Sequence, residues 1–302
     1  MPLVSMQSMM QDALAGGYGL GYFEAWDSYS LEAVLEAAEE QRSPVILGFG
    51  GMMADTEWLN RGGVEMLGAI GNVAARRARV PVCLLFNEAQ TLEQALRGID
   101  AGFNAVMVDT SAWPWDRAVD AVAHLVRVAH ARNVTVEAEL GRLPDATDAG
   151  IDASAAQLTD PAQAAKFISE TGADCLAVSI GNVHLLTAHD APVDIARLAA
   201  IHDEVRAPLV IHGGTSFPQN AVPQAIANGV AKFNVGTILK KTFLQGAVEA
   251  LGGSPDRMDV HALLGSHKEA DFLVAGKSAM KDKVKERMRL YGSSNRAVEL
   301  DG

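Results

Sequence analysis

The amino-acid sequence predicts an α/β fold, a (β/α)8 or TIM barrel that forms a single domain over residues 1–302. Two observations support this prediction. Short apolar segments alternate with longer segments of helical periodicity, and no internal linker interrupts the alternation. The short segments are apolar nearly throughout, which is typical of parallel strands buried on both faces. An open doubly wound sheet is the alternative, but eight strand–helix repeats fit a closed barrel better. With 302 residues, 49% of them hydrophobic, the chain can bury a large core.

Each predicted strand is a short run of β-branched and other apolar residues. The eight runs are Tyr18–Phe23, Pro44–Phe49, Val80–Phe86, Ala105–Asp109, Val134–Glu139, Cys175–Ile180, Pro208–His212 and Lys232–Val235. The segments between them carry Ala, Leu, Val and Ile at three- and four-residue intervals, which indicates helices with one buried face. These helices are predicted over Leu31–Gln41, Trp58–Arg77, Leu92–Gly102, Arg117–Arg132, Pro161–Gly172, Ile195–Val205, Asn220–Gly229 and Leu239–Leu251.

Residues at the ends of these segments agree with the helix prediction. Asp160 stands before Pro161, so a capping side chain precedes a proline that suits the first helical position. Gly102, Gly172 and Gly229 stand where helices end, and a left-handed backbone is common there. The local signals therefore support the boundaries that the periodicity gives.

Two segments lie outside the repeats. Gly141–Thr159 is polar, rich in Ala and Asp, and follows the fifth predicted strand. A loop of this length in a compact domain is usually functional or mobile, and this one could close over a site. The second segment is a charged helix over about residues 277–291, with Ala279, Met280, Val284 and Met288 on one stripe. This helix could pack on its own barrel or on a partner subunit.

Charge excludes two classes of partner. The chain has 25 Lys and Arg and 37 Asp and Glu, which gives a formal net charge of −12. Both signs are mixed along the chain without a basic run, so neither a nucleic acid nor an anionic membrane is an expected partner. A phosphorylated small molecule remains compatible, because backbone amides can hold a phosphate inside an acidic protein.

The cysteines and the N-terminus indicate the compartment. Cys83 and Cys175 lie in apolar runs and are expected to be small buried hydrophobic residues, not a disulfide or a metal-binding pair. The N-terminus lacks a basic stretch followed by an apolar one, and no window approaches the ~20 apolar residues that span a bilayer. We therefore expect a soluble, cytoplasmic protein.

Candidate reactive groups stand at the carboxyl ends of the predicted strands, where barrel enzymes carry their active sites. These residues are Glu24, Asn87, Glu88, Asp109, Glu137, Glu139, Asn182, His184, His212 and Asn234. A single histidine at a strand end is more often structural. Two on consecutive strands, facing carboxylates, favour a site for a divalent metal such as Zn²⁺, Mn²⁺, Fe²⁺ or Co²⁺.

Two glycine turns follow the seventh and eighth predicted strands. One is His212-Gly213-Gly214-Thr215-Ser216 and the other is Asn234-Val235-Gly236-Thr237. Glycine lets backbone N–H groups approach an anion, and the helix that follows adds a favourable dipole. A tight turn also needs glycine without any ligand. The two turns together, at the positions where barrels often bind phosphate, predict a phosphate site.

These segments resemble the class II, metal-dependent ketose-bisphosphate aldolases, which include the fructose- and tagatose-bisphosphate aldolases. The resemblance runs over most of the chain in several independent motifs. They are Gly16-Gly17-Tyr18, Ser43-Pro44-Val45-Ile46, Val106 to Ser111, Val136-Glu137-Ala138-Glu139-Leu140-Gly141, Leu176 to His184, Leu209-Val210-Ile211-His212-Gly213-Gly214, Lys232-Phe233-Asn234-Val235-Gly236-Thr237 and Lys277-Ser278-Ala279-Met280.

The resemblance implies three metal-binding histidines, of which two correspond to His184 and His212. At the third position this chain has Glu88, so the expected ligands are His184, His212 and Glu88, with Zn²⁺ the favoured metal. Glu139 and Asp109 resemble family residues near a secondary, buried metal position. We expect these two to be alternate ligands or to orient the ligands.

Three other positions depart from the family pattern. Asn87 replaces the aspartate that shuttles a proton on the hydroxyl beside the breaking carbon–carbon bond, and an amide cannot take up a proton at neutral pH. Leu185 replaces a glycine that helps to embrace the phosphate, and Glu24 stands where the family usually has asparagine. We hypothesise that Glu24 supplies the missing carboxylate while Asn87 orients the substrate. The alternative is that Glu24 is a solvated loop residue.

The resemblance implies a metal-dependent carbon–carbon lyase that acts on a ketose phosphate or related hydroxy-ketone through an enediolate. Asn234 would hydrogen-bond the substrate, and its anionic end would be held by Gly181, Gly213, Gly214, Thr215, Ser216, Gly236 and Thr237. Two alternatives remain: a decarboxylase, isomerase or epimerase on the same scaffold, and a degenerate protein that only binds a sugar phosphate. The resemblance also implies a homodimer or homotetramer.

Overall fold

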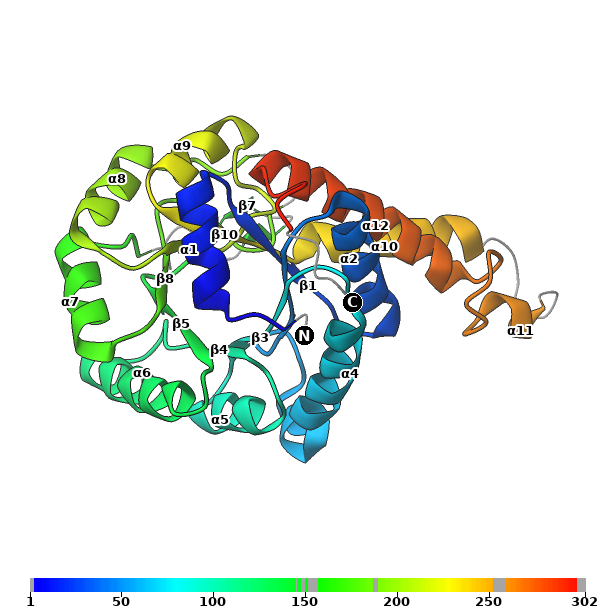
Figure 1. Cartoon of the computed structure of the whole chain (residues 1–302), viewed down its shortest axis with the longest axis horizontal. Coiled ribbons are helices and arrows are strands. Elements are labelled where there is room, and N and C mark those ends of the chain that lie inside the picture. Colours follow the sequence, from blue (N-terminus) through cyan, green and yellow to red (C-terminus); the bar gives the residue numbers. More distant parts are fainter. Residues whose placement is uncertain are drawn as a thin grey trace.

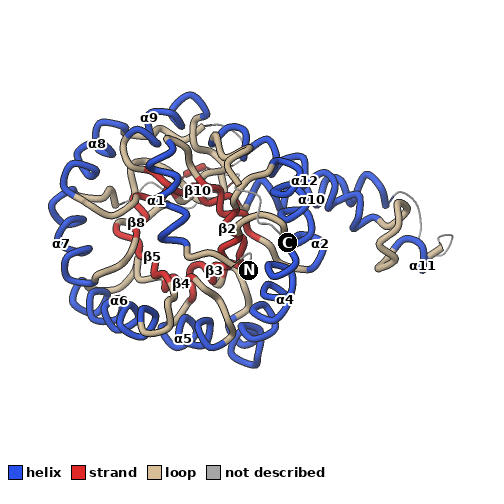
Figure 2. Tube along the Cα trace, viewed as in Figure 1, coloured by secondary structure: helices blue, strands red, loops and turns tan. Residues whose placement is uncertain are grey.

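The computed structural model shows a closed barrel of parallel strands, as the sequence predicts. Around the barrel the strands follow the order β1-β10-β9-β8-β5-β4-β3-β2, and they form the ring at the centre of Figure 2. In chain order they are β1 (Leu20–Glu24), β2 (Val45–Gly50), β3 (Val82–Ala89), β4 (Ala105–Val108), β5 (Thr135–Leu140), β8 (Cys175–Val178), β9 (Leu209–Ile211) and β10 (Val230–Val235). The structure describes residues 3–144, 146–147, 150–151, 157–186, 190–251 and 259–297.

Helices surround the strands (Figure 1). The outer layer consists of α2 (Ser28–Gln41), α4 (Val64–Arg77), α5 (Leu92–Asp100), α6 (Trp115–His130), α7 (Pro161–Thr171), α8 (Ile195–Glu204), α9 (Val222–Ala227) and α10 (Thr237–Leu251). The predicted helix over 58–77 is divided, because α3 (Thr56–Trp58) and a π-helical turn, η1 (Leu59–Gly63), precede α4. Gly62 breaks the helix there with a φ of 118°. A short 3-10 turn, η3 (Gln219–Ala221), precedes α9.

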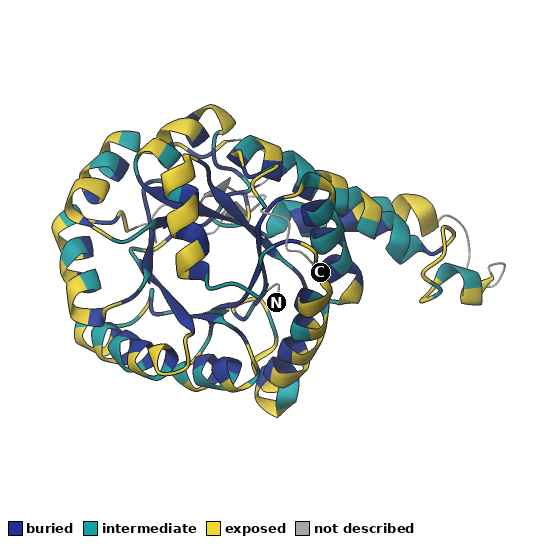
Figure 3. Cartoon of the chain, in the orientation of Figure 1, coloured by how far each residue is buried: buried dark blue, intermediate teal, exposed yellow. Residues whose placement is uncertain are grey.

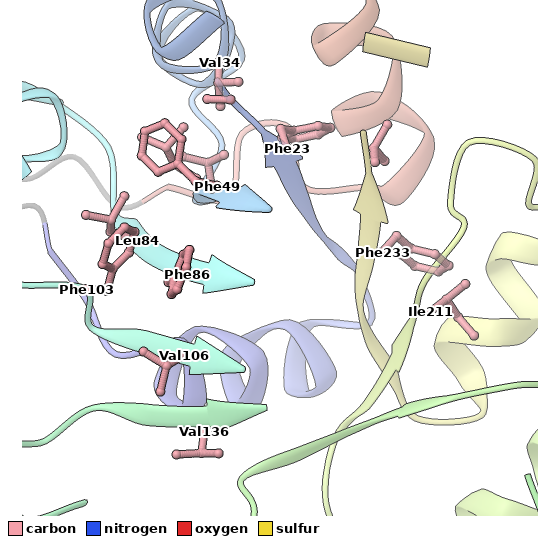
Figure 4. Packing of buried hydrophobic residues seen from close by; sticks show 14 of the residues in the cluster. Phe23, Val34, Phe49, Leu84, Phe86, Phe103, Val106, Val136, Ile211 and Phe233 are labelled. Carbon is pink, nitrogen blue, oxygen red and sulfur yellow. The ribbon is translucent and has the colours of Figure 1, made fainter. Parts of the chain in front are cut away.

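The main core lies between the strands and the helices. Figure 3 shows that the helices turn their buried faces toward the barrel and their exposed faces outward. Figure 4 shows outward-facing strand side chains in this layer, among them Phe23, Phe49, Phe86 and Phe233, all at most 1% exposed. Successive strand residues point to opposite faces, so the neighbours of these residues point into the barrel. Cys83 and Cys175, both buried and free, are among those inward residues, as expected.

One end of the barrel is closed by a helix that the sequence analysis did not predict. This helix, α1 (Met6–Gly16), ends at Gly17, whose left-handed conformation (φ 65°) terminates it. Its buried residues Met6, Met9 and Met10 pack against inward-facing strand residues such as Leu20. The backbone N–H of Val4 donates to the carbonyl of Val82 at the start of β3. The helix therefore covers the amino ends of the strands and leaves the carboxyl ends free for a site.

The C-terminal helix packs on its own barrel. This helix, α12 (Phe272–Tyr291), begins before residue 277 because Asp271 caps it, and together with α10 it forms an arm that carries α11 (Val260–Leu263) (Figure 1). Of its predicted apolar stripe, Met280, Val284 and Met288 are fully buried and Ala279 is half-buried. A ladder of ion pairs joins it to α2 through Lys277, Lys281 and Lys285 on α12 and Glu32, Glu36 and Glu40 on α2.

Part of the predicted loop over 141–159 lies outside the described residues, namely 145, 148–149 and 152–156. Within this loop, β6 (Ala146–Thr147) pairs with β7 (Gly150–Ile151) in an antiparallel arrangement. Every helix in the described ranges is too short or too polar to cross a bilayer.

Candidate metal and substrate site

Four predicted ligands meet at the carboxyl ends of the strands. Glu88, Glu139, His184 and His212 each place one ligand atom within 4.8 Å of those of the other three. They come from β3, β5 and the turns that follow β8 and β9; β5, β8 and β9 are neighbours around the barrel, and β4 separates β3 from β5. The closed barrel therefore brings these four ligands together, as their positions at the strand ends predicted.

A contact between His212 and Glu137 determines which ring nitrogen of His212 faces this group. Nε2 of His212 lies 2.9 Å from Oε1 of Glu137, and Nζ of Lys232 lies 2.7 Å from Oε2 of the same carboxylate. Burial raises the pKa of Glu137, but Lys232 and His212 outweigh burial and lower this pKa to about 2. Glu137 is thus an anion that accepts the Nε2 proton, which leaves Nδ1 as the nitrogen that faces the other carboxylates.

The atoms around Nδ1 of His212 are close without being hydrogen-bonded. Oε2 of Glu139 lies 2.7 Å from Nδ1 and Oε1 of Glu88 lies 3.2 Å from it. Nδ1 and the Glu139 oxygen are nevertheless buried atoms with no hydrogen-bond partner of acceptable geometry. Buried polar atoms normally have partners, so these two indicate that something else satisfies them. A cation is the partner that two convergent lone pairs can share.

The local charge also fits a cation. Glu88, Glu137 and Glu139 carry three negative charges and Lys232 one positive charge, which leaves the charge that a divalent ion would balance. Burial lowers the pKa of His212, but Glu139, Glu137 and Glu88 outweigh burial and raise this pKa well above its usual value, so the carboxylates favour positive charge at this point and a bound metal ion would take the place of the proton. The residues present therefore fit a divalent metal in ligand type, ligand number and charge.

The end of β3 positions Asn87 and Glu88 through an irregular backbone. The pairing of β3 with β4 shifts register between Phe86 and Ala89, and Glu88 has a left-handed φ of 51°. That conformation is uncommon for a residue other than glycine, and it turns the Glu88 side chain toward the metal group. Asn87 is 3% exposed, and its Oδ1 has no hydrogen-bond partner.

A cavity of about 80 Å³ adjoins the metal group. Its walls include Glu88, His184 and His212, and also Tyr22, Glu24, Asn87 and Asn234. Besides Nδ1 of His212, three polar atoms of these wall residues are buried without a partner, namely Tyr22 Oη, Asn87 Oδ1 and Asn234 Nδ2. Lys232 Nζ donates to Oδ1 of Asn234 over 2.6 Å, which fixes the amide with Nδ2 as the remaining donor. The cavity therefore offers both donors and acceptors to a polar ligand.

Glu24 lies at the rim of this cavity and is mostly enclosed. Nζ of Lys240, on the first turn of α10, lies 2.7 Å from Oε1 of Glu24. A Cβ atom at Gly236 would lie 2.2 Å from Oε2 of Glu24, so the carboxylate approaches the start of α10 only because residue 236 is glycine. Burial raises the pKa of Glu24, Lys240 opposes this rise, and Glu88 adds to it; the net pKa is raised. The hypothesis that Glu24 faces the site, and is not a free loop residue, fits this position.

The two predicted glycine turns lie beside the cavity. Gly213 has a φ of 69°, and a Cβ there would lie 2.2 Å from the carbonyl oxygen of Val183, so packing alone already requires this glycine. The backbone N–H of Ile238 donates to Oγ1 of Thr215 over 3.3 Å and ties the two turns together. Thr237 is the first residue of α10, and the backbone N–H groups of Leu239 and Lys240 donate to the carbonyl of Gly236. Gly213, Thr215, Gly236 and Thr237 line the cavity, whereas Gly181, Gly214 and Ser216 are not among its lining residues.

Two remaining predictions concern Asp109 and Leu185. Asp109 directly follows β4 and is not a member of the metal group among the described residues; its Oδ1 accepts the backbone N–H of Ser111 over 2.9 Å. Leu185 has a φ of 63°, a conformation that glycine adopts without strain. The position therefore retains the backbone of a glycine although it carries a leucine.

The sequence analysis named Glu137 only as a strand-end candidate and gave no role to Tyr22 or Lys232, although all three contribute to the site. Each precedes a predicted site residue by two positions, namely Glu139, Glu24 and Asn234 in that order. Side chains two apart on a strand share a face, so these residues form the next layer inside the barrel. The two-residue spacing from a predicted site residue could therefore have identified these residues from the sequence. Arg287 on α12 donates to the carbonyl of Thr215 over 3.2 Å, a contact for which the sequence gives no signal.

Known proteins show the same sequence pattern. The family described as class II fructose-bisphosphate aldolase matches residues 4–296. A fructose-bisphosphate aldolase from Geobacillus stearothermophilus is 33% identical over 307 aligned residues, which cover 99% of this chain and 100% of that protein.

Solved structures agree. The crystal structure of the YdjI aldolase from Escherichia coli K12 has a TM-score of 0.80 at 28% identity, over 98% of this chain and 100% of that chain. Fructose-bisphosphate aldolase (Fba) from Campylobacter jejuni has a TM-score of 0.74 at 21% identity, over 97% of this chain and 96% of that chain, and supports the fold alone. These comparisons do not favour the decarboxylase, isomerase, epimerase or binding-only alternatives. The chain belongs to the class II fructose-bisphosphate aldolase family and is a metal-dependent aldolase, a carbon–carbon lyase.

Proposed function

We propose that this aldolase cleaves or forms a ketose phosphate at the barrel mouth, around a zinc ion held by His184, His212 and Glu88. Glu139 is an alternate or additional ligand, and Asp109 orients neighbouring groups. The observation that supports this most directly is the convergence of four ligand atoms within 4.8 Å of one another. In this group, Nδ1 of His212 and Oε2 of Glu139 are buried and lack hydrogen-bond partners. Two imidazoles and one carboxylate form a ligand set of known catalytic zinc sites.

A divalent cation bound there supplies positive charge that polarises a substrate carbonyl and stabilises the enediolate left by cleavage. The remaining work belongs to the side chains. Glu24 accepts the proton of the hydroxyl beside the breaking bond, the O–H electrons form the aldehyde carbonyl, and the carbon–carbon electron pair stays with the ketone half. Asn87 orients that hydroxyl, and Asn234 donates Nδ2 to the substrate. The raised pKa of Glu24 makes it a stronger base than an exposed glutamate.

The anionic end of the substrate would lie at the two glycine turns, whose proposed ligands are Gly181, Gly213, Gly214, Thr215, Ser216, Gly236 and Thr237. The N-terminus of α10 supports this placement, because the helix dipole favours an anion there. Lys240 adds an ammonium group at the same rim. Glu24 opposes a phosphate at this end by charge, so Lys240 must compensate it.

The test combines metal analysis with two substitutions. Wild-type protein should contain or bind zinc, and should cleave fructose or tagatose 1,6-bisphosphate in a coupled assay until a chelator is added. Glu88→Gln should lose zinc affinity and activity together. Glu24→Gln should keep the zinc and lose activity by about 10²–10⁴-fold, the usual contribution of acid–base catalysis. Glu93→Gln, at an exposed position on α5, is the matched control. Absence of metal binding, or full activity of both site variants, would overturn the proposal.

We also propose that the enzyme is cytoplasmic and is a homodimer or homotetramer. Exposed apolar residues at helical spacing support self-association, since Met66 and Val73 on α4 are 62% and 61% exposed. Leu244 and Val248 on α10 are 63% and 62% exposed. Light scattering at several protein concentrations measures the mass of the assembly, and a constant monomer mass would reject this part.

A further inference from the structure

The hydroxyl of Tyr22 is a buried group that the mechanism above does not use. Tyr22 lies on β1 and is 2% exposed, and its ring packs in the apolar cluster that contains Met6 and Met10. Tyr22 lines the cavity beside the metal group, and its hydroxyl has no hydrogen-bond partner. A buried hydroxyl without a partner costs free energy that a phenylalanine would not, and Tyr22, unlike Tyr291, lines a cavity that a ligand could enter.

The neighbours of this hydroxyl indicate what it would bind. Tyr22 and Asn234 are direct register partners on the adjacent parallel strands β1 and β10. Both carry an unused hydrogen-bonding group, Oη in one and Nδ2 in the other, and both line the same cavity. Lys232 holds the pair from below, with Nζ 5.0 Å from the Tyr22 ring centroid and 2.6 Å from Oδ1 of Asn234. Two donors fixed side by side can meet on one ligand oxygen.

The surroundings of Tyr22 keep its proton in place. Burial raises the pKa of the hydroxyl well above its usual value, and the carboxylates Glu24, Glu88 and Glu137 raise it further. The group is therefore a hydroxyl, not a phenolate, at neutral pH. A fixed donor of this kind stabilises an oxygen that gains negative charge.

We propose that Tyr22 is a catalytic residue whose hydroxyl, together with Asn234 Nδ2, donates a hydrogen bond to the substrate oxygen that becomes negative when the carbon–carbon bond breaks. This inference rests on the proposed function, because that oxygen belongs to the enediolate. Tyr22 transfers no proton and acts as one of two fixed donors. Such a donor acts mainly in the transition state, so its loss lowers kcat more than it raises KM.

The experiment compares Tyr22→Phe with Tyr291→Phe. Tyr291 also has a buried hydroxyl without a partner, is 1% exposed, and stacks on Phe233 outside the residues that line the cavity. Each substitution removes one unpaired buried hydroxyl, so neither should lower the thermal midpoint of the metal-free protein. Tyr22→Phe should reduce kcat by about 10²–10³-fold with little change in KM or zinc affinity. Tyr291→Phe should leave kcat unchanged.

Each outcome has a distinct meaning. If Tyr22→Phe keeps kcat within about threefold of wild type, the role of Tyr22 is overturned while the aldolase proposal stands. If Tyr22→Phe lowers the thermal midpoint or the zinc affinity as well as the activity, the hydroxyl is structural, and the inference again fails. The third outcome is that the zinc-loaded wild type cleaves neither fructose 1,6-bisphosphate nor tagatose 1,6-bisphosphate and does not bind dihydroxyacetone phosphate in calorimetry. In that case the proposed function fails, and this inference fails with it.

Discussion

The two ends of the barrel interior differ in how completely their atoms are paired. At the amino end, α1 places Met6, Met9 and Met10 against the apolar inward residues of the strands. At the carboxyl end the same strands carry carboxylates, imidazoles and amides, several of which lack hydrogen-bond partners. The first arrangement gains free energy from burial, and the second gives some up by leaving polar atoms unsatisfied.

The difference between the two ends separates residues that stabilise the fold from residues that form the site. Tyr22 belongs to both ends, since it is a member of the apolar cluster and also lines the cavity. Glu137 and Lys232 mark the boundary, because they are fully buried but completely paired. We expect substitutions below this boundary to change stability alone, substitutions above it to change activity, and substitutions at the boundary to change both.

The largest effect is expected at the boundary, from Glu137→Gln. The change leaves the Lys232 ammonium, which is 0% exposed, without its counter-charge, and breaking a buried pair in this way costs about 3–5 kcal/mol. His212 also loses the anion that orients it, so zinc affinity should fall by about 10–100-fold. Urea denaturation of the metal-free protein measures the first effect, and competition with a metal indicator measures the second.

The control for this prediction is the double variant Glu137→Leu with Lys232→Met. Replacing a buried ion pair by apolar residues of similar size is often near neutral in stability. The double variant should therefore recover much of the free energy of unfolding but not the zinc affinity. If Glu137→Gln were as stable as wild type, the pair of Glu137 and Lys232 would contribute nothing to stability. These two residues would then not mark a boundary between the two ends.

A smaller effect, confined to stability, is expected from Met10→Ala at the amino end. Met10 is 0% exposed within the α1 cluster, and truncating a buried methionine costs about 2–5 kcal/mol through lost burial and a residual cavity. The value should lie toward the lower end, because α1 is peripheral and can relax. Denaturation should show the loss while kcat and KM at a temperature well below unfolding stay unchanged.

Gln11→Ala provides the comparison for Met10→Ala, since Gln11 is the next residue of α1 and is exposed. It should change the free energy of unfolding by less than about 0.5 kcal/mol. If Met10→Ala instead lowered kcat without loss of stability, the amino end would be coupled to the mouth and the separation would be wrong.

The same separation explains how much of the molecule could be predicted from the sequence. The strands are predictable because residues buried on both faces give uninterrupted apolar runs, and their carboxyl ends locate Glu88, Glu139, His184 and His212. The helix α1 was missed although Met6, Met9, Met10 and Ala13 have helical spacing, because it precedes the first repeat.

Side-chain contacts set a different limit on prediction. That Glu137 pairs with Lys232 depends on two strands that are distant in the sequence, β5 and β10, facing each other across the barrel. That the Tyr22 hydroxyl lacks a partner depends on the shape of one small cavity. Neither property is encoded in local periodicity or in a motif, since each follows from the closure of the sheet. A residue pair or a vacant hydrogen bond can be recognised only once the register of the strands is known.

The smallest effect is expected at the rim, from Leu185→Gly. Leu185 is 36% exposed and has a φ of 63°, where a residue with a Cβ is strained by about 1–2 kcal/mol. Glycine relieves that strain but loses about 0.5–1 kcal/mol of conformational entropy, so the net gain should be about 0.5–1 kcal/mol. Thermal and urea unfolding both report this change. Leu186→Gly is the matched control, because Leu186 is only 6% exposed, packs with Val183 and Ala191, and should lose stability.

Leu185→Gly also tests the proposed anion site, since Leu185 lines the cavity beside Gly213. Removing the side chain gives an anionic group closer access to the backbone of the turn, so KM for a phosphorylated ketose should fall while kcat stays similar. A more stable variant with unchanged KM would mean that the backbone strain is real but the phosphate lies elsewhere. A less stable variant would mean that the Leu185 side chain makes packing contacts that exceed the strain of its backbone, and the rim would then belong with the packed part of the barrel.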